Sequence, residues 1–153
     1  MKALEEAWTR LRLRRCASVG RGVRLRGGVW VHGEGAVRLG DGVVLDGAAV
    51  PIELHAGAGA EIVVGPGTVV RGGTSIEAMR SVTIGARCRV GAFCKILDNH
   101  FHVVRRMATR PPSLPVSIED DALLGPRCVV LPGGHIARGE ALRGGTVRAG
   151  SRR

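Results

Sequence analysis

Aromatic side chains are almost absent from this chain. Of its 153 residues, 3% are aromatic, with two Phe, two Trp and no Tyr, whereas 44% are hydrophobic. A core without aromatic anchors must be built from Val, Leu, Ile and Ala, as in stacked aliphatic ladders. The shortage also argues against nucleic-acid binding, because single-stranded nucleic acids stack their bases on aromatic rings. We therefore expect no nucleic-acid partner.

Long hydrophobic runs are missing as well. No stretch approaches the roughly 18 apolar residues of a membrane span, and the first residues lack the apolar region of a signal peptide. These absences lead us to expect no integral membrane segment and a cytoplasmic location.

Lysine and paired cysteines are scarce. Lys2 and Lys95 are the lysines, so the formal net charge of +10 comes almost wholly from arginine. Such a surface attracts phosphates and other anions. The four cysteines form no CxxC pair and have no zinc-ligand spacing, so we expect inert thiols and no metal site.

A six-residue repeat is clearest over Ile84–His102, IGARCRVGAFCKILDNHFH. Aliphatic residues recur at Ile84, Val90 and Ile96, glycine follows the first two, and the next position in the frame is His102. A hexad is too short for a heptad helix. It fits a solenoid in which each short strand places one aliphatic residue in the core and glycine relieves the turn.

The same frame extends over most of the chain and survives two interruptions. It slips between Ala48 and Ala60, and it breaks over 97–115. Its aliphatic positions are Val19, Leu25, Val31, Leu39, Leu45, Val64, Val70, Ile76, Ile84, Val90, Ile96, Ile118, Leu124, Val130 and Ile136. The pattern predicts an all-β fold, a parallel β-helix over 16–150 with roughly six coils.

The first fifteen residues predict a short helix. Leu4, Trp8 and Leu11 fall at helical spacing, with acidic residues early and arginines late, as the helix dipole favours. We expect residues 1–15 to cap the open end of the solenoid, which otherwise exposes unpaired backbone. A basic helix on a membrane surface is the alternative.

The break at 97–115 is the one long loop extruded from the coils, and such loops tend to be functional. Asp98, His100 and His102 lead into it at alternate positions, so they share one face of an extended strand. His32, His55 and His135 lie in or beside hexads elsewhere without acidic companions, and structural or exposed roles are expected for all three.

The hexads, the DNHFH start of the loop, the PVSI stretch after it and the later LLGPRCVVLPGGHI resemble the hexapeptide-repeat acyltransferases. More narrowly, they are similar to the sugar O-acetyltransferases of bacterial polysaccharide and lipopolysaccharide biosynthesis, over about Val19–Val147. The resemblance implies a left-handed β-helix, a homotrimer, and acetyl-CoA bound in a cleft between neighbouring subunits. It also implies a sugar acceptor, including nucleotide-linked or lipid-linked sugars, which suit the positive charge.

The position that matches the family's catalytic base is His102, with His100 as the rival. A neutral imidazole is suited to removing the proton of a sugar hydroxyl. Asp98 is expected to hold the other ring nitrogen and fix the tautomer. The cysteines have no evident base beside them, so direct transfer is expected without an acyl-enzyme.

The donor-binding positions implied by the resemblance are Leu123, Gly125, Gly144 and Arg148. The family usually has tryptophan where Leu123 stands and a small residue where Pro126 stands, and Pro126 has no N–H to offer. Gly144 is expected to present backbone to the donor, and Arg148 to meet a CoA phosphate.

Two alternatives remain open on the same fold. A zinc enzyme related to the β-helical carbonic anhydrases needs three histidines, of which His100 and His102 supply two. A non-catalytic scaffold subunit is favoured by the departures at Leu123 and Pro126.

Overall fold

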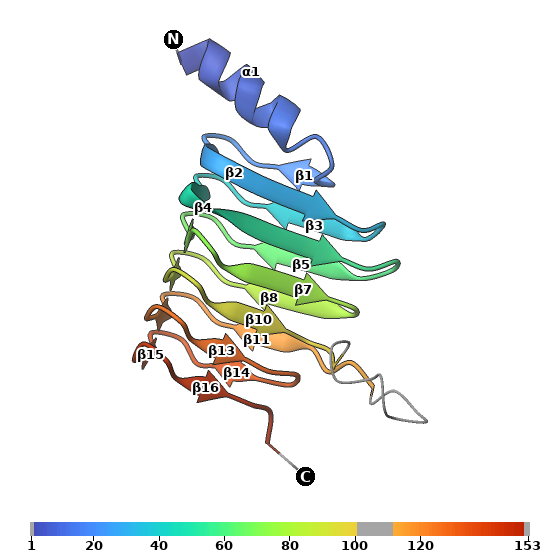
Figure 1. Ribbon diagram of the computed structural model, residues 1–153, viewed down its shortest axis with the longest axis vertical. Helices are drawn as coiled ribbons and strands as arrows, with labels where there is room; N and C mark the ends of the chain where they lie inside the picture. The colour runs from blue at the N-terminus through green and yellow to red at the C-terminus, as the bar shows by residue number, and fades with distance from the viewer. Residues whose placement is uncertain (1, 101–111, 152–153) are drawn as a thin grey trace.

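The chain winds into a parallel β-helix in which short strands stack coil upon coil (Figure 1). The computed structural model describes residues 2–100 and 112–151. Its elements are α1 (Lys2–Arg12), β1 (Ser18–Val19), β2 (Arg24–His32), β3 (Ala36–Leu39), β4 (Val44–Ala56), β5 (Glu61–Val64), β6 (Val69–Arg71), β7 (Ser75–Ala78), β8 (Ser81–Ile84), β9 (Arg89–Val90), β10 (Lys95–Leu97), β11 (Val116–Ile118), β12 (Leu123–Leu124), β13 (Val129–Val130), β14 (His135–Ile136), β15 (Ala141–Leu142) and β16 (Val147–Arg148). The predicted fold, with its short N-terminal helix, is confirmed.

The strands form three faces. The first face is the six-stranded sheet β1-β3-β5-β8-β11-β14. The other two belong to one sheet, because β2 and β4 are long enough to turn a corner. Their first parts lie beside β6, β9, β12 and β15 in the second face, and their second parts lie beside β7, β10, β13 and β16 in the third.

The hexad aliphatics are the core. On the first face, Leu39, Val64, Ile84, Ile118 and Ile136 lie in register on successive coils. All five are at most 3% exposed. Each such burial contributes roughly 1.5–3 kcal/mol. Stacked ladders of this kind hold the coils together without aromatic anchors.

The position four residues after a hexad aliphatic often holds a small side chain, as at Thr68, Thr74, Cys88, Cys94 and Cys128. This small-residue slot also carries hydrogen bonds between coils. Thr74 Oγ1 donates to the Gly91 carbonyl (2.8 Å) and accepts from the Cys94 N–H (3.2 Å). The Cys94 thiol in turn donates to the Gly125 carbonyl, at 3.3 Å. Equivalent bonds to the next coil come from Thr68, Cys88 and Cys128. Where this position holds Thr or Cys, the side chain therefore links neighbouring coils, whereas the buried Ala122 fills it without a donor.

The slip in the repeat between Ala48 and Ala60 has a simple cause. Gly27 pairs with Gly47, but Val29 pairs with Ile52. One residue of β2 therefore lies opposite the four residues 48–51 of β4. The three extra residues are accommodated at the corner, and the hexad frame resumes beyond them.

Helix α1 lies against the first coil near the N-terminal end of the solenoid, with few contacts to it (Figure 1). Thr9 is its buried residue, and Leu13, just beyond the helix, is fully buried. Leu4, Trp8 and Leu11 are instead 75%, 49% and 58% exposed. No helix in the described ranges is long and apolar enough to cross a membrane.

Candidate functional site

Asp98 is a buried carboxylate at the point where the chain leaves β10. It is fully buried. Its Oδ1 accepts hydrogen bonds from the Met79 N–H (2.8 Å) and the Asn99 side-chain amide (3.0 Å). Its Oδ2 accepts from the backbone N–H groups of Arg80 and Ser81, both at 2.7 Å. An ionised carboxylate has about four accepting positions, and these four donors fill them.

The bonds to Asp98 fix where the extruded loop starts and ends. They tie the residue after β10 to the corner between β7 and β8 on the preceding coil. The Leu114 N–H donates to the Asp98 carbonyl at 2.9 Å, so the returning chain is held at the same corner. Sequence reasoning placed Asp98 beside an imidazole. The structure shows that its carboxylate is bonded chiefly to backbone.

The two candidate bases, His100 and His102, follow Asp98 at the start of the extruded loop. His100 is half-buried two residues after Asp98. His102 lies outside the described residues, so its assignment as the base stays a prediction. Arg105, Arg106 and Arg110, which the sequence suggests as acceptor contacts in the same loop, lie outside the described residues too.

Three of the four predicted donor residues, Leu123, Gly125 and Gly144, lie one face away from Asp98, whereas Arg148 lies on β16 in the third face. Leu123 is 45% exposed on β12, in the second face. Gly125 and Gly144 follow β12 and β15 at the corner between the second and third faces, and a Cβ on Gly125 would come within 2.5 Å of the Gly144 nitrogen. Asp98 lies at the far end of the third face, about 15 Å away for a face four or five residues wide. A single chain therefore brings the donor glycines together but does not bring them to the loop.

Arg148 is held by an ion pair. Its guanidinium donates to both carboxylate oxygens of Glu140, at 2.6 and 3.2 Å, and to the His135 carbonyl at 3.0 Å. The hydrogen bonds from Arg148 lower the pKa of Glu140 and raise that of Arg148. Arg148 is thus already neutralised where the sequence suggested a phosphate ligand.

Phe93 and Arg127 are exposed at the corner that carries Gly125 and Gly144, and sequence reasoning missed them. The guanidinium carbon of Arg127 lies 5.3 Å from the centre of the Phe93 ring. Both residues have positive φ, 58° and 60°, where neighbouring coils have glycine at positions 73 and 145. Such a backbone costs a non-glycine residue about 1–2 kcal/mol, and Arg87 and Asp121, at the corner between the first and second faces, adopt it as well. The sequence signal that could have found them is a bulky residue at a corner position where the repeat elsewhere has glycine.

Two histidines do have acidic companions, contrary to the sequence interpretation. His135 Nε2 lies 3.1 Å from Glu119 Oε2. His32 Nε2 lies 3.8 Å from Glu53 Oε1. Each partner lies on a neighbouring coil, 16 or more residues away in sequence, where inspection of nearby residues does not reach.

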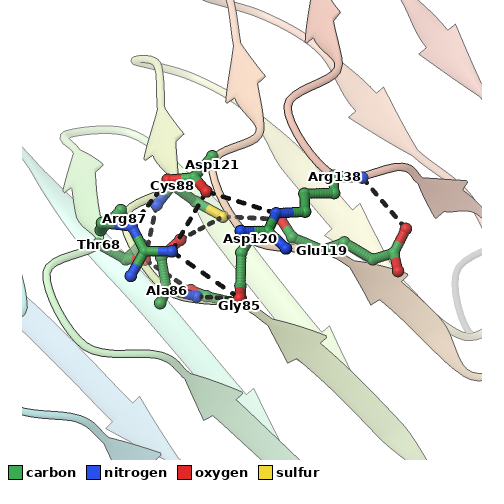
Figure 2. Close-up of polar contacts among 9 residues, drawn as sticks. All are labelled: Thr68, Gly85, Ala86, Arg87, Cys88, Glu119, Asp120, Asp121 and Arg138. Atoms are coloured by element: carbon green, nitrogen blue, oxygen red, sulfur yellow. Dashed lines mark hydrogen bonds and ion pairs between the residues drawn. The ribbon is translucent and has the colours of Figure 1, made fainter.

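An ion-pair network occupies the corner between the first and second faces (Figure 2). Arg87 makes two hydrogen bonds to Asp121, at 2.8 and 3.2 Å, and Arg138 approaches the same carboxylate at 3.8 Å. Asp120 accepts from the Ala86 N–H at 2.8 Å. These opposite charges neutralise one another, and the contacts between them link three successive coils. This corner is therefore assigned to stability and not to chemistry.

The surroundings of the cysteines make their thiols unreactive. Cys88, Cys94 and Cys128 are fully buried in the small-residue slot. Burial raises the pKa of Cys94 to about 11 and that of Cys16 to about 11, and it also raises the pKa of Cys88. A thiol with a raised pKa is a poor nucleophile at neutral pH. In the described part of the chain, no three His, Cys, Asp or Glu side chains are grouped to hold a metal ion.

Comparison with known proteins adds little to this geometry. No protein-family model and no curated protein matches the sequence. Among solved structures, the chain is similar to a hexapeptide transferase family protein from Anaplasma phagocytophilum, with 16% identity over 89% of this chain and 76% of that one. The TM-score of that match is 0.36, too low to carry an argument, so the functional argument rests on the residues themselves.

Proposed function

We propose that this protein is an acyltransferase that moves an acetyl group from acetyl-CoA to a hydroxyl of a sugar-containing acceptor, with His102 as general base. The observation that carries the proposal is the anchored start of the DNHFH segment. Asp98, with its four donors, fixes the point at which the chain leaves β10. The resemblance to sugar O-acetyltransferases rests on the same segment.

The chemistry needs one base and no covalent intermediate. The neutral imidazole removes the hydroxyl proton as that oxygen attacks the thioester carbonyl carbon. The tetrahedral intermediate then collapses, the carbon–sulfur bond breaks, and the imidazolium returns the proton to the departing CoA sulfur. Backbone N–H groups stabilise the oxyanion between these steps. Because the base must be the neutral imidazole, the rate should rise with pH as that imidazole loses its proton.

Asp98 is proposed as a positioning residue. Because its accepting positions are filled, it acts on the base through the backbone of the loop and not through a hydrogen bond to the imidazole. This differs from the sequence-based expectation, in which the carboxylate selected the tautomer directly.

The donor is proposed to bind at the corner between the second and third faces. Gly125 and Gly144 present backbone there, beside the exposed Leu123. Phe93 offers an aromatic surface and Arg127 a guanidinium for phosphate. Since this corner is one face away from Asp98, we propose a homotrimer in which the loop of one subunit meets the donor corner of the next.

A scaffold subunit without catalytic activity is the second candidate. The ion pair of Arg148 with Glu140 favours it, as do Leu123 in place of tryptophan and Pro126 without an N–H. It predicts a trimeric solenoid that binds no acyl-CoA.

An acetyl-transfer assay with a panel of sugar acceptors tests the proposal. Replacing His102 with Ala should lower the rate about 10²–10⁴-fold, whereas His135→Ala, an exposed histidine paired with Glu119, should leave it unchanged. If His100→Ala carries the loss instead, the base is His100. Equal rates in all four proteins would exclude a histidine base in this loop.

A further inference from the structure

Helix α1 leaves its three large apolar side chains mostly exposed. Leu4, Trp8 and Leu11 recur at spacings of four and three residues, so they form one stripe along the helix. They are 75%, 49% and 58% exposed, whereas the buried residue of the helix is Thr9. We call these three residues the α1 stripe. Contiguous apolar groups left in water at one end of a molecule mark an interaction surface.

The surroundings of the α1 stripe are strongly basic. Residues 2–32 contain eight cations and two carboxylates, a net charge of +6 out of +10 for the whole chain. Every one of the eight is exposed. They are Lys2, Arg10, Arg12, Arg14, Arg15, Arg21, Arg24 and Arg26. More than half of the net charge therefore lies in the first fifth of the sequence.

Apolar and basic groups are in contact at this end. The guanidinium carbon of Arg12 lies 4.8 Å from the centre of the Trp8 ring. Leu11, Arg14 and the 56% exposed Trp30 line the groove between the helix and β2. Tryptophan, leucine and arginine together are the composition of helices that lie in the interfacial region of a bilayer.

From this arrangement we propose that α1 and the first coil bind the surface of an anionic membrane. The α1 stripe enters the boundary between headgroups and acyl chains, and the arginines around it contact lipid phosphates. The helix is 11 residues long, about 16 Å, and so it lies on the membrane without crossing it. A second copy of the chain fits this end less well, because pairing the stripes would bring two ends of charge +6 together. The proposal does not depend on the acyltransferase activity.

Vesicle binding of the full chain, measured without any acyl donor, tests the proposal. In the Trp30→Phe variant, Trp8 is the remaining tryptophan, and its emission should shift to the blue with phosphatidylcholine vesicles that contain about a third phosphatidylglycerol. In the Trp8→Phe variant, Trp30 should shift less. Co-sedimentation with these vesicles should exceed that with pure phosphatidylcholine by more than about tenfold, and high salt should weaken it.

Variants of the α1 stripe show whether its binding partner is a membrane or a second copy of the chain. Leu4→Ser with Leu11→Ser should lower vesicle binding by about tenfold or more and leave the unfolding curve unchanged, because both side chains are exposed. Val147→Ser, at a 61% exposed position near the C-terminal end, is the matched control and should bind as wild type. Absence of binding to anionic vesicles, or equal binding to neutral ones, overturns the proposal. So does a self-association that the stripe variants abolish, since the α1 stripe then belongs to a protein interface.

Discussion

The guanidinium of Arg127 lies over the ring of Phe93, with 5.3 Å between the guanidinium carbon and the ring centre. Both residues occupy left-handed backbone positions that neighbouring coils give to glycine. The contact places an exposed cation and an exposed aromatic ring beside Gly125 and Gly144. In our account this corner, and not Arg148, holds the charged part of the acyl donor.

The first prediction compares the two arginines. Arg127→Ala should weaken acetyl-CoA binding about tenfold or more, because a charge-assisted hydrogen bond to phosphate contributes roughly 1.5–3 kcal/mol. Arg148→Ala should change affinity less than about threefold, because the Arg148 guanidinium is already paired with Glu140. Calorimetric titration of both variants measures the difference. The reverse order would move the donor site onto the third face.

A second prediction concerns the buried carboxylate. Asp98→Asn should lower the free energy of unfolding by about 2–4 kcal/mol, since the amide keeps one accepting oxygen and turns an NH₂ toward backbone N–H donors. Asp41→Asn is the control, because Asp41 accepts one backbone bond at an exposed site. It should cost less than about 1 kcal/mol. Urea denaturation of the two variants distinguishes them, and similar losses would argue against the anchoring role of Asp98.

The small-residue slot gives a third prediction. Thr74→Val keeps the shape but removes the hydroxyl that bonds Gly91 and Cys94, leaving a buried N–H and a carbonyl without their partner. The unfolding free energy should fall by about 1–3 kcal/mol. Thr83→Val, at an exposed strand position, should be neutral within about 0.5 kcal/mol. A neutral Thr74→Val would show that the slot selects for size alone.

A fourth prediction is a loss of stability in alkali. The pKa of Cys16 and of Cys94 rises from 9.0 to about 11 on folding because burial disfavours the thiolate. Between these values the folded protein keeps protons that the unfolded chain has released, so the free energy of unfolding falls as the pH rises from about 9 to 11. Urea midpoints across this range should decline, and the double variant Cys16→Ala, Cys94→Ala should show a shallower decline. An equal slope in both proteins would assign the loss to other groups.

The fold could be predicted because the hexad is a local pattern. Each aliphatic position, such as Ile84 or Ile118, needs only its own frame to be recognised, and the register of the coils follows. The slip near Ala48 is visible in the sequence as a break in the frame, but the corner at which the three extra residues lie follows only from the pairing of β2 with β4.

The site was harder to predict because its contacts run between coils. The three backbone donors to Asp98 lie on the preceding coil, 17 to 19 residues earlier, and the glutamate beside His135 lies 16 residues away. Such pairs become neighbours once coil lengths are known. The positive φ of Phe93 and Arg127 likewise depends on where each corner falls.

Calorimetric titration of acetyl-CoA into the wild-type protein and the His102→Ala variant tests the central claim most directly. Our account predicts saturable binding by both proteins, because the donor corner is separate from the base, with acetyl transfer lost from the variant alone. Absence of binding by either protein, up to about millimolar acetyl-CoA, would contradict the acyltransferase proposal and favour a scaffold subunit.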